Sequence, residues 1–129
     1  MKKIAIVCLV LLVAVTSASA QAQDKQRAND LKQIGLAYHN YYDANRKGPT
    51  KVEDLEPYYE KDKRITGLLN SGDVVFLYGA DLLKQTEGTS KTVLAYEKQV
   101  PEKGGLVLMC DGSVKKMTAE EFKKAPKAK

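Results

Sequence analysis

Residues 24–45 read DKQRANDLKQIGLAYHNYYDAN, and the rest of the domain is organised around this stretch. Its apolar residues recur at spacings of three and four, the period of one stripe on an α-helix. Asp24 is placed to cap the helix, and Gly48-Pro49 ends it, because proline cannot continue a helix. We therefore predict a long amphipathic helix as the spine of the domain. Its apolar stripe comprises Ala28, Leu31, Ile34, Gly35, Tyr38 and Tyr42.

The stretch before this helix has the three features of a secretory signal peptide. Lys2 and Lys3 give a positive start, residues 4–15 are an unbroken apolar run, and residues 18–20 form an A-x-A cleavage site. The apolar run is shorter than the ~20 residues that a bilayer span needs. We expect cleavage after Ala20, a secreted or periplasmic location and no stable membrane span afterwards. The alternative is an uncleaved N-terminus that anchors the protein in the inner membrane.

The segment that follows the cleavage site has the length of one domain, residues 21–122, with a basic tail at 123–129. Removal of Lys2 and Lys3 leaves 19 of the 21 basic residues against 16 acidic ones, and four of the 19 lie in the tail. The domain itself is close to neutral, so we expect no basic face for nucleic acid. We expect the tail to be a frayed, solubilising end.

Leu36 interrupts the pattern of the long helix. At 100° per residue it points away from the apolar stripe, among Asn29, Lys32, Asn40 and Asp43. One interpretation is an isolated surface leucine, which is common. The other is a contact with a partner protein on the outer face of the helix. The candidate contact residues are Leu36, Lys32 and Asn40.

The second half of the chain has the pattern of strands. Residues 73–78, 91–97, 106–110 and 113–117 are rich in β-forming residues, and Asp111-Gly112 between the last two predicts a two-residue type I′ hairpin. Thr50 with Glu53, and Thr118 with Glu121, match the capping box of a short helix. Residues 60–72 have the composition of a loop. The predicted fold is α+β, with the long N-terminal helix packed on a four-stranded antiparallel sheet and short extra helices.

Both faces of the predicted hairpin carry apolar side chains. A two-residue turn places Leu106, Leu108, Cys110 and Met117 on one face and Val107, Met109 and Val114 on the other. One helix cannot cover both faces of a sheet. Either residues 50–72 cover the second face or it is left for a partner.

The sequence contains no recognisable catalytic constellation. His39 on the flank of the helix and Cys110, the one cysteine outside the signal peptide, form the one conceivable dyad. Cys110 lies on a predicted strand beside Leu108, which favours burial. One histidine and one cysteine cannot fill a structural zinc site, so we expect no metal and no cofactor.

Two segments resemble a large bacterial family of prepilin-like proteins, built like type IV pilins and type II secretion pseudopilins. Residues 29–43, NDLKQIGLAYHNYYD, are similar to the family stretch NNLKQIGLALHNYHD. Residues 106–114, LVLMCDGSV, are similar to NVLFADGSV at the end of its C-terminal signature, a His, nine residues and Asp-Gly in a hairpin. Pro101 stands at the position of that His, and the chain lacks the family's class III leader and its Phe-Thr-Leu-Ile-Glu start. The resemblance implies a pilin-like head, and it transfers no catalytic residues.

These observations predict an exported, non-enzymatic, pseudopilin-like interaction module. We expect its partner to be a protein of the cell envelope or of a secretion or pilus-like machinery, possible partners including pilin-like subunits. The alternative is a secreted binding or inhibitor protein that acts on an envelope polymer or enzyme through residues 60–72 and 98–105. An enzyme that uses His39 and Cys110 is the third hypothesis.

Overall fold

The computed structural model describes the backbone of residues 2–129 and the side chains of residues 21–129. The side chains of the predicted signal peptide lie outside the described residues, and the structure does not test its cleavage. Within the described part of the chain, no helix combines the length and apolar character needed to cross a membrane. The elements, with η for a 3-10 helix, are α1 (Lys2–Asn45), α2 (Val52–Leu55), η1 (Glu56–Tyr59), α3 (Lys63–Ser71), β1 (Val74–Phe76), η2 (Leu82–Lys84), β2 (Val93–Glu97), α4 (Val100–Lys103), β3 (Gly105–Met109), β4 (Val114–Met117) and α5 (Ala119–Lys124).

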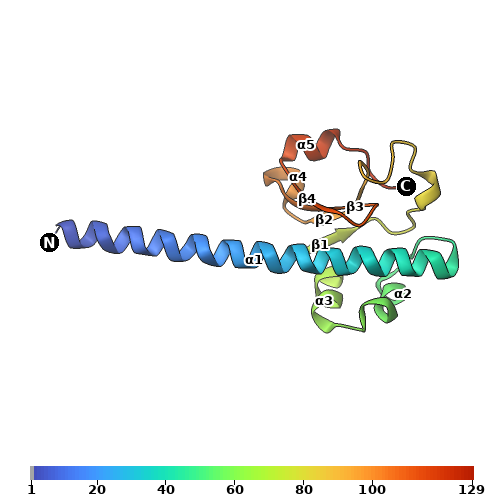
Figure 1. Cartoon of the computed structure of the whole chain (residues 1–129), viewed down its shortest axis with the longest axis horizontal. Helices are drawn as coiled ribbons and strands as arrows, with labels where there is room; N and C mark the ends of the chain where they lie inside the picture. The colour runs from blue at the N-terminus through green and yellow to red at the C-terminus, as the bar shows by residue number, and fades with distance from the viewer. Residues whose placement is uncertain (1) are drawn as a thin grey trace.

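The architecture is the predicted α+β fold (Figure 1). The sheet lies along one side of α1, and α2 and α3 lie on the other side of α1 in this view, while α4 and α5 lie over the far face of the sheet. Asp24 is not an N-cap, because the helix continues through the residues before it. Its carboxylate instead approaches the Lys116 ammonium of β4 at 3.6 Å.

The sheet has the strand order β1-β2-β3-β4, and each strand pairs with its neighbour in antiparallel fashion. This confirms the predicted four-stranded antiparallel sheet. The main core lies between α1 and the sheet, because the apolar stripe of α1 faces the strands. Its fully buried residues include Leu31, Ile34 and Tyr38 of α1 with Leu94 and Leu108 of the sheet.

The last hairpin differs from the predicted type I′ turn. Gly112 has φ of 91°, but Asp111 does not have positive φ. The Met109 N–H donates to the Ser113 carbonyl at 2.8 Å, and the Gly112 N–H donates to the Met109 carbonyl at 3.0 Å. This is a three-residue loop, a type I turn followed by a left-handed glycine. The Asp111 carboxylate favours it by accepting hydrogen bonds from the Ser113 backbone N–H (2.9 Å) and hydroxyl (2.6 Å).

The extra loop residue shifts the register between the two strands by one position. Leu108 pairs with Val114 and Gly105 with Met117. A shift of one residue moves every side chain of a strand to the opposite face. Val114 therefore packs in the core against α1, and Met117 packs on the far face. The predicted faces were right for β3 and wrong for these two residues of β4.

The far face of the sheet is covered from within the chain. The apolar residues of this face pack against the short helices α4 and α5. Residues 50–72, one of the two covers considered from the sequence, do not cover this face. The rings of Tyr96 and Phe122 lie 4.6 Å apart, centre to centre. The buried members are Val93, Val100, Val107, Met109 and Phe122.

Residues 60–72 are not a loop, because they contain the nine-residue helix α3. The Asp62 side chain caps it by accepting the Arg64 backbone N–H at 2.9 Å, and Gly72 ends it with φ of 83°. Ile65 and Leu69, four residues apart, are its buried face. The capping residues Asp62 and Gly72 and the four-residue spacing of the apolar pair were visible in the sequence.

The two predicted capping boxes have different outcomes. Thr118 and Glu121 form the predicted reciprocal pair at the start of α5. Thr50 does not pair with Glu53. Its backbone N–H and hydroxyl donate to the Asp54 carboxylate at 3.0 and 3.2 Å, and α2 begins at Val52.

The basic C-terminal segment is docked on the sheet, which corrects the expectation of a frayed tail. Lys123 and Lys124 belong to α5. Beyond it, the Val93 N–H donates to the Pro126 carbonyl at 2.8 Å, and the Ala128 N–H donates to the Val93 carbonyl at 2.8 Å. The Lys127 ammonium lies 4.2 Å from the centre of the Phe122 ring. The segment occupies the start of β2, where β1 does not pair.

Candidate partner-binding site

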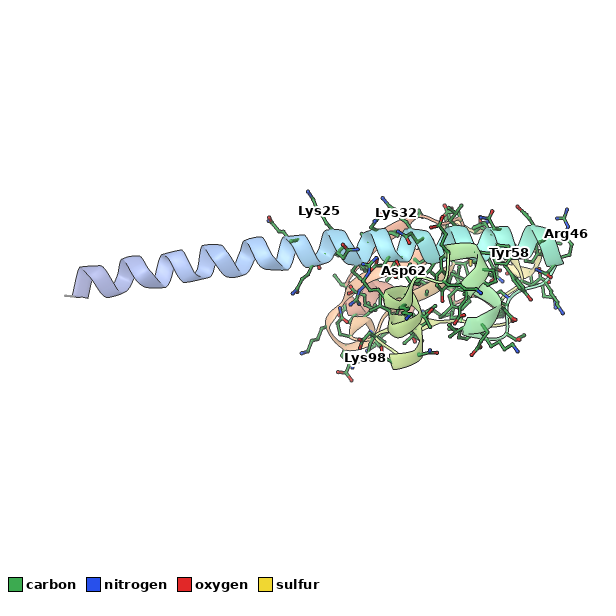
Figure 2. The ribbon with its side chains drawn as sticks, turned by 90° about the horizontal axis from the view of Figure 1, so that it is seen from below. Lys25, Lys32, Arg46, Tyr58, Asp62 and Lys98 are labelled. Carbon is green, nitrogen blue, oxygen red and sulfur yellow. The ribbon has the colours of Figure 1, made fainter. Side chains whose placement is uncertain are left out.

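The three predicted contact residues lie on the outer face of α1. Leu36, Lys32 and Asn40 are all exposed, and Leu36 exposes 61% of its surface. Figure 2 shows Lys32 projecting from α1 away from the body of the domain. The helical spacing therefore placed these side chains correctly relative to the core. Their exposure is a structural fact, and the contact with a partner stays a prediction.

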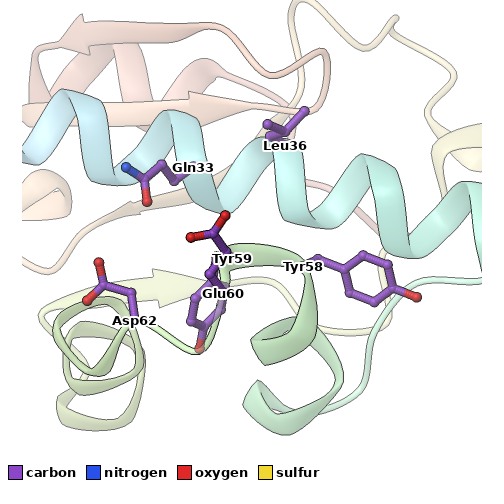
Figure 3. A pocket seen from close by; sticks show the side chains of 6 residues that line it. All are labelled: Gln33, Leu36, Tyr58, Tyr59, Glu60 and Asp62. Atoms are coloured by element: carbon purple, nitrogen blue, oxygen red, sulfur yellow. The ribbon is translucent and has the colours of Figure 1, made fainter.

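Leu36 also lines a groove between α1 and the segment that leads into α3 (Figure 3). The groove has a volume of about 560 Å³. Lys32 and Asn40 lie one turn to either side of Leu36 and are not among the lining residues. The lining residues are Gln33, Leu36, Tyr58, Tyr59, Glu60 and Asp62. Tyr58 and Tyr59 come from η1, and no local pattern in the sequence indicates that they lie beside the outer face of α1.

The far wall of the groove is held by aromatic and hydroxyl contacts. The Tyr58 ring packs edge-on against Tyr41 of α1, with centres 5.8 Å apart. Tyr59 is buried, and its hydroxyl lies 2.6 Å from the Thr66 hydroxyl of α3. Burial raises the pKa of the Tyr59 phenol above its usual value, because the charged form would lose its hydration. The wall is therefore fixed to both α1 and α3.

The rim of the groove contains a strained turn. Glu60 and Lys61 have φ of 60° and 55°, a left-handed conformation that is unfavourable for residues with a Cβ. The Lys61 N–H donates to the Glu56 carbonyl at 2.9 Å, which holds the turn in place. The Glu60 side chain is exposed beside the groove. The rim thus presents a carboxylate next to the apolar surface of Leu36.

An ion pair between a buried carboxylate and a partly exposed guanidinium joins α3 to α1. Asp30 is 2% exposed, and its Oδ1 accepts from the Arg64 guanidinium at 2.8 Å and from the Gln26 amide at 3.1 Å. Arg64 also approaches the Asp62 carboxylate at 3.6 Å. No local pattern indicates this contact, because Asp30 and Arg64 are far apart along the chain. The ion pair links α1 to the start of α3, directly after the segment that lines the groove.

His39 and Cys110 lie close together but do not form a nucleophilic dyad. The His39 Nε2 lies 2.7 Å from the Cys110 backbone carbonyl, which only accepts, so Nε2 carries the proton. The thiol is fully buried, and burial, followed by the charge of Asp111, raises its pKa to about 11. At neutral pH the sulfur is therefore a protonated thiol without a base directed at it.

The two segments that carry the family resemblance meet at this same point. Gly35 of α1 lies so close to the hairpin that a Cβ there would be 2.9 Å from Leu108 Cδ1 and 3.3 Å from Gly112 Cα. His39, one turn further along, bonds to the hairpin carbonyl. In the predicted signature turn, Gly112 thus lies against the helix, whereas Asp111 is exposed and accepts hydrogen bonds from Ser113 within the turn. The contacts between α1 and the hairpin are therefore packing contacts that hold the fold together.

The described side chains contain no group of three or more His, Cys, Asp or Glu residues placed to hold a metal ion. Comparison of the chain with protein-family models, with curated proteins and with solved structures finds no match. The structure therefore classifies the chain by its architecture alone, as an α+β domain with a long N-terminal helix.

Proposed function

We propose that this protein is an exported, non-enzymatic, pseudopilin-like interaction module that binds a protein of the cell envelope through the Leu36 groove. The observation that carries the proposal is a leucine that exposes 61% of its surface and lines a groove of about 560 Å³. Burial of such surface stabilises a complex by roughly 25 cal/mol per Å². Leu36 contributes little to folding, so this energy is available for binding.

The composition of the groove supports a protein partner. Tyr58 offers a rigid aromatic surface, Leu36 an aliphatic one, and Glu60 a carboxylate at the rim. Protein interfaces commonly combine an apolar or aromatic centre with a polar rim. The signal-peptide pattern and the pilin-like sequence segments support an envelope location and a partner from a secretion or pilus-like machinery.

The alternative is a secreted binder or inhibitor that acts on an envelope polymer or enzyme. Glu60 and Asp62, from the segment assigned to that role, line the same groove. The identity of the captured partner separates the two proposals, since a glycan or a protease supports the alternative.

The test is capture of partners from envelope extract with the wild-type protein and with Leu36→Asp. The matched control is Leu83→Asp, because Leu83 of η2 is 87% exposed and lies outside the groove. We expect Leu36→Asp to lose the partner and Leu83→Asp to keep it, with both variants within about 1 kcal/mol of wild-type stability. Equal capture by all three proteins, or unfolding of Leu36→Asp, would contradict the proposal.

Export is tested by mass spectrometry of the protein recovered from the envelope fraction. A mature chain that begins at Gln21 supports a released head. A retained N-terminus supports the membrane-anchored alternative.

A further inference from the structure

We propose that a second copy of this chain occupies the Leu36 groove, with the two α1 helices antiparallel about a two-fold axis near Leu36. This inference rests on the proposed function, because it names the partner of the same surface. It is carried by the pattern of charge along the exposed face of α1 and by the groove beside it.

The outward face of α1 carries a stripe of exposed residues centred on Leu36. At 100° per residue, the members of this stripe lie within about 40° of Leu36 around the helix axis. All of them are exposed, and Figure 2 shows Lys25 and Lys32 projecting from the same side of α1. The stripe residues are Lys25, Asn29, Lys32, Leu36, Asn40 and Asp43.

The charge of this stripe changes sign at Leu36. Lys25 and Lys32 lie on its N-terminal side, and Asp43 lies on its C-terminal side. An antiparallel second copy brings the Lys32 of one chain opposite Asn40 of the other, one turn from Asp43, whereas a parallel copy places like charges together. Among the side chains that the structure describes, neither Lys32 nor Asp43 takes part in an ion pair. Both charges are therefore free to pair across the axis.

The groove supplies the shape for this contact. In a two-fold contact each residue pair occurs twice, so the stripe and the groove must be complementary to themselves. At the axis, the Leu36 side chain of the second copy covers the exposed Leu36 of the first, at the edge of the groove that this residue lines. We expect a weak, transient dimer, because the contact is confined to one helix face and the adjoining groove.

The decisive experiment is charge reversal, measured by sedimentation equilibrium of the exported protein up to about 1 mM. We expect the wild type to show a concentration-dependent dimer. Lys32→Glu and Asp43→Lys should each weaken it about tenfold, because each places like charges together twice per dimer. The double variant should restore it, since it exchanges the two charges. A wild type that stays monomeric overturns the inference.

Controls separate this contact from other modes of association. Leu36→Asp should abolish the dimer and Leu83→Asp should not. Oxidation of Leu36→Cys should give a disulfide-linked dimer across the axis, and Leu83→Cys should not. A dimer that ignores the Leu36 and charge variants arises elsewhere in the chain and overturns the inference. Loss of an envelope partner by Leu36→Asp in a monomeric protein overturns only the second copy and leaves the proposed function in place.

Discussion

At the scale of single residues, Gly35 is a point of close approach between α1 and the hairpin. A Cβ there would meet the side chain of Leu108, which is fully buried, and the backbone of Gly112. Gly67 is also in a helix, α3, but a Cβ there would meet nothing within 4 Å. Gly35 is therefore required by the close packing around it, whereas the space around Gly67 would accept a larger residue.

We expect Gly35→Ala and Gly67→Ala to change stability in opposite directions. Alanine is favoured over glycine in a helix by about 0.5–1 kcal/mol, which should appear as stabilisation in Gly67→Ala. In Gly35→Ala, overpacking against Leu108 costs roughly 1–3 kcal/mol, which exceeds that gain. Urea denaturation of both variants measures the difference. A stabilised Gly35→Ala would show that the helix and hairpin can move apart.

Leu36 is a second residue that matters at this scale, because it is exposed and so is available for binding and not for the core. Its neighbours in sequence, Gly35 and Ala37, are buried, whereas Leu36 faces outward. Helical period alone produces this difference, because consecutive residues lie 100° apart. The exposure of Leu36 was predictable for that reason. The groove beside it was not.

At the scale of elements, the C-terminal segment shows how a charged stretch can be ordered by backbone pairing. Pro126 and Ala128 bond to both backbone groups of Val93, and Lys127 donates to the carbonyls of Phe122 and Ala125 at the end of α5. These contacts close the start of β2 and cover Phe122. The segment acts as a short extra strand at a position that β1 leaves open.

We expect deletion of residues 126–129 to destabilise the domain by about 1–3 kcal/mol. The deletion leaves the buried N–H and carbonyl of Val93 without partners and uncovers part of Phe122. The control variant, Lys123→Ala with Lys124→Ala, removes two exposed charges and no such contact, so its melting temperature should stay near that of the wild type. Equal stability of the truncated and full-length proteins would show that the segment is frayed in solution.

The hairpin is the element where a local signal misled. Asp-Gly between two apolar runs is typical of a two-residue turn, but the Asp111 side chain bonds forward to Ser113 and favours a three-residue loop. That single residue moves Val114 into the core against α1 and Met117 to the far face. Turn type therefore decided which side of the sheet each β4 residue covers.

At the scale of the whole molecule, two buried acids link the stability of the fold to alkaline pH. Burial raises the pKa of Cys110 from 9.0 to about 11, and it raises the pKa of Tyr38, which is fully buried, above its usual value of 10.0. Both groups release their protons at lower pH when the chain unfolds. The unfolded state is therefore favoured once the pH exceeds the unfolded value of about 9, and this loss continues until the folded groups also ionise.

We expect the free energy of unfolding to fall steadily as the pH rises from about 9 to about 11, with little contribution from these two groups below pH 8. Urea denaturation at a series of pH values, followed by circular dichroism, measures the change. Cys110→Ala should make the decline between pH 9 and 11 shallower, since it removes the thiol. An identical slope in this variant would show that the thiol is not the cause.

The long helix, the α+β class, the four antiparallel strands and the outward direction of Leu36 follow from the sequence alone, because each depends on a local period. Period 3.6 identified the buried stripe of α1, and period 2 identified the strands. The helix at 63–71 was also within reach, since Asp62, Ile65, Leu69 and Gly72 mark its start, face and end.

Only the tertiary structure decided the rest, because it depends on contacts between residues far apart in the chain. The Asp30–Arg64 ion pair, the cover of the far sheet face by α5, the docked C-terminal segment and the groove between Leu36 and Tyr58 all join separate elements. The local propensity of a segment contains no information about such tertiary contacts. The register of the last hairpin is an exception, because it depends on a local contact: the Asp111–Ser113 side-chain hydrogen bonds override the usual preference of the Asp-Gly turn.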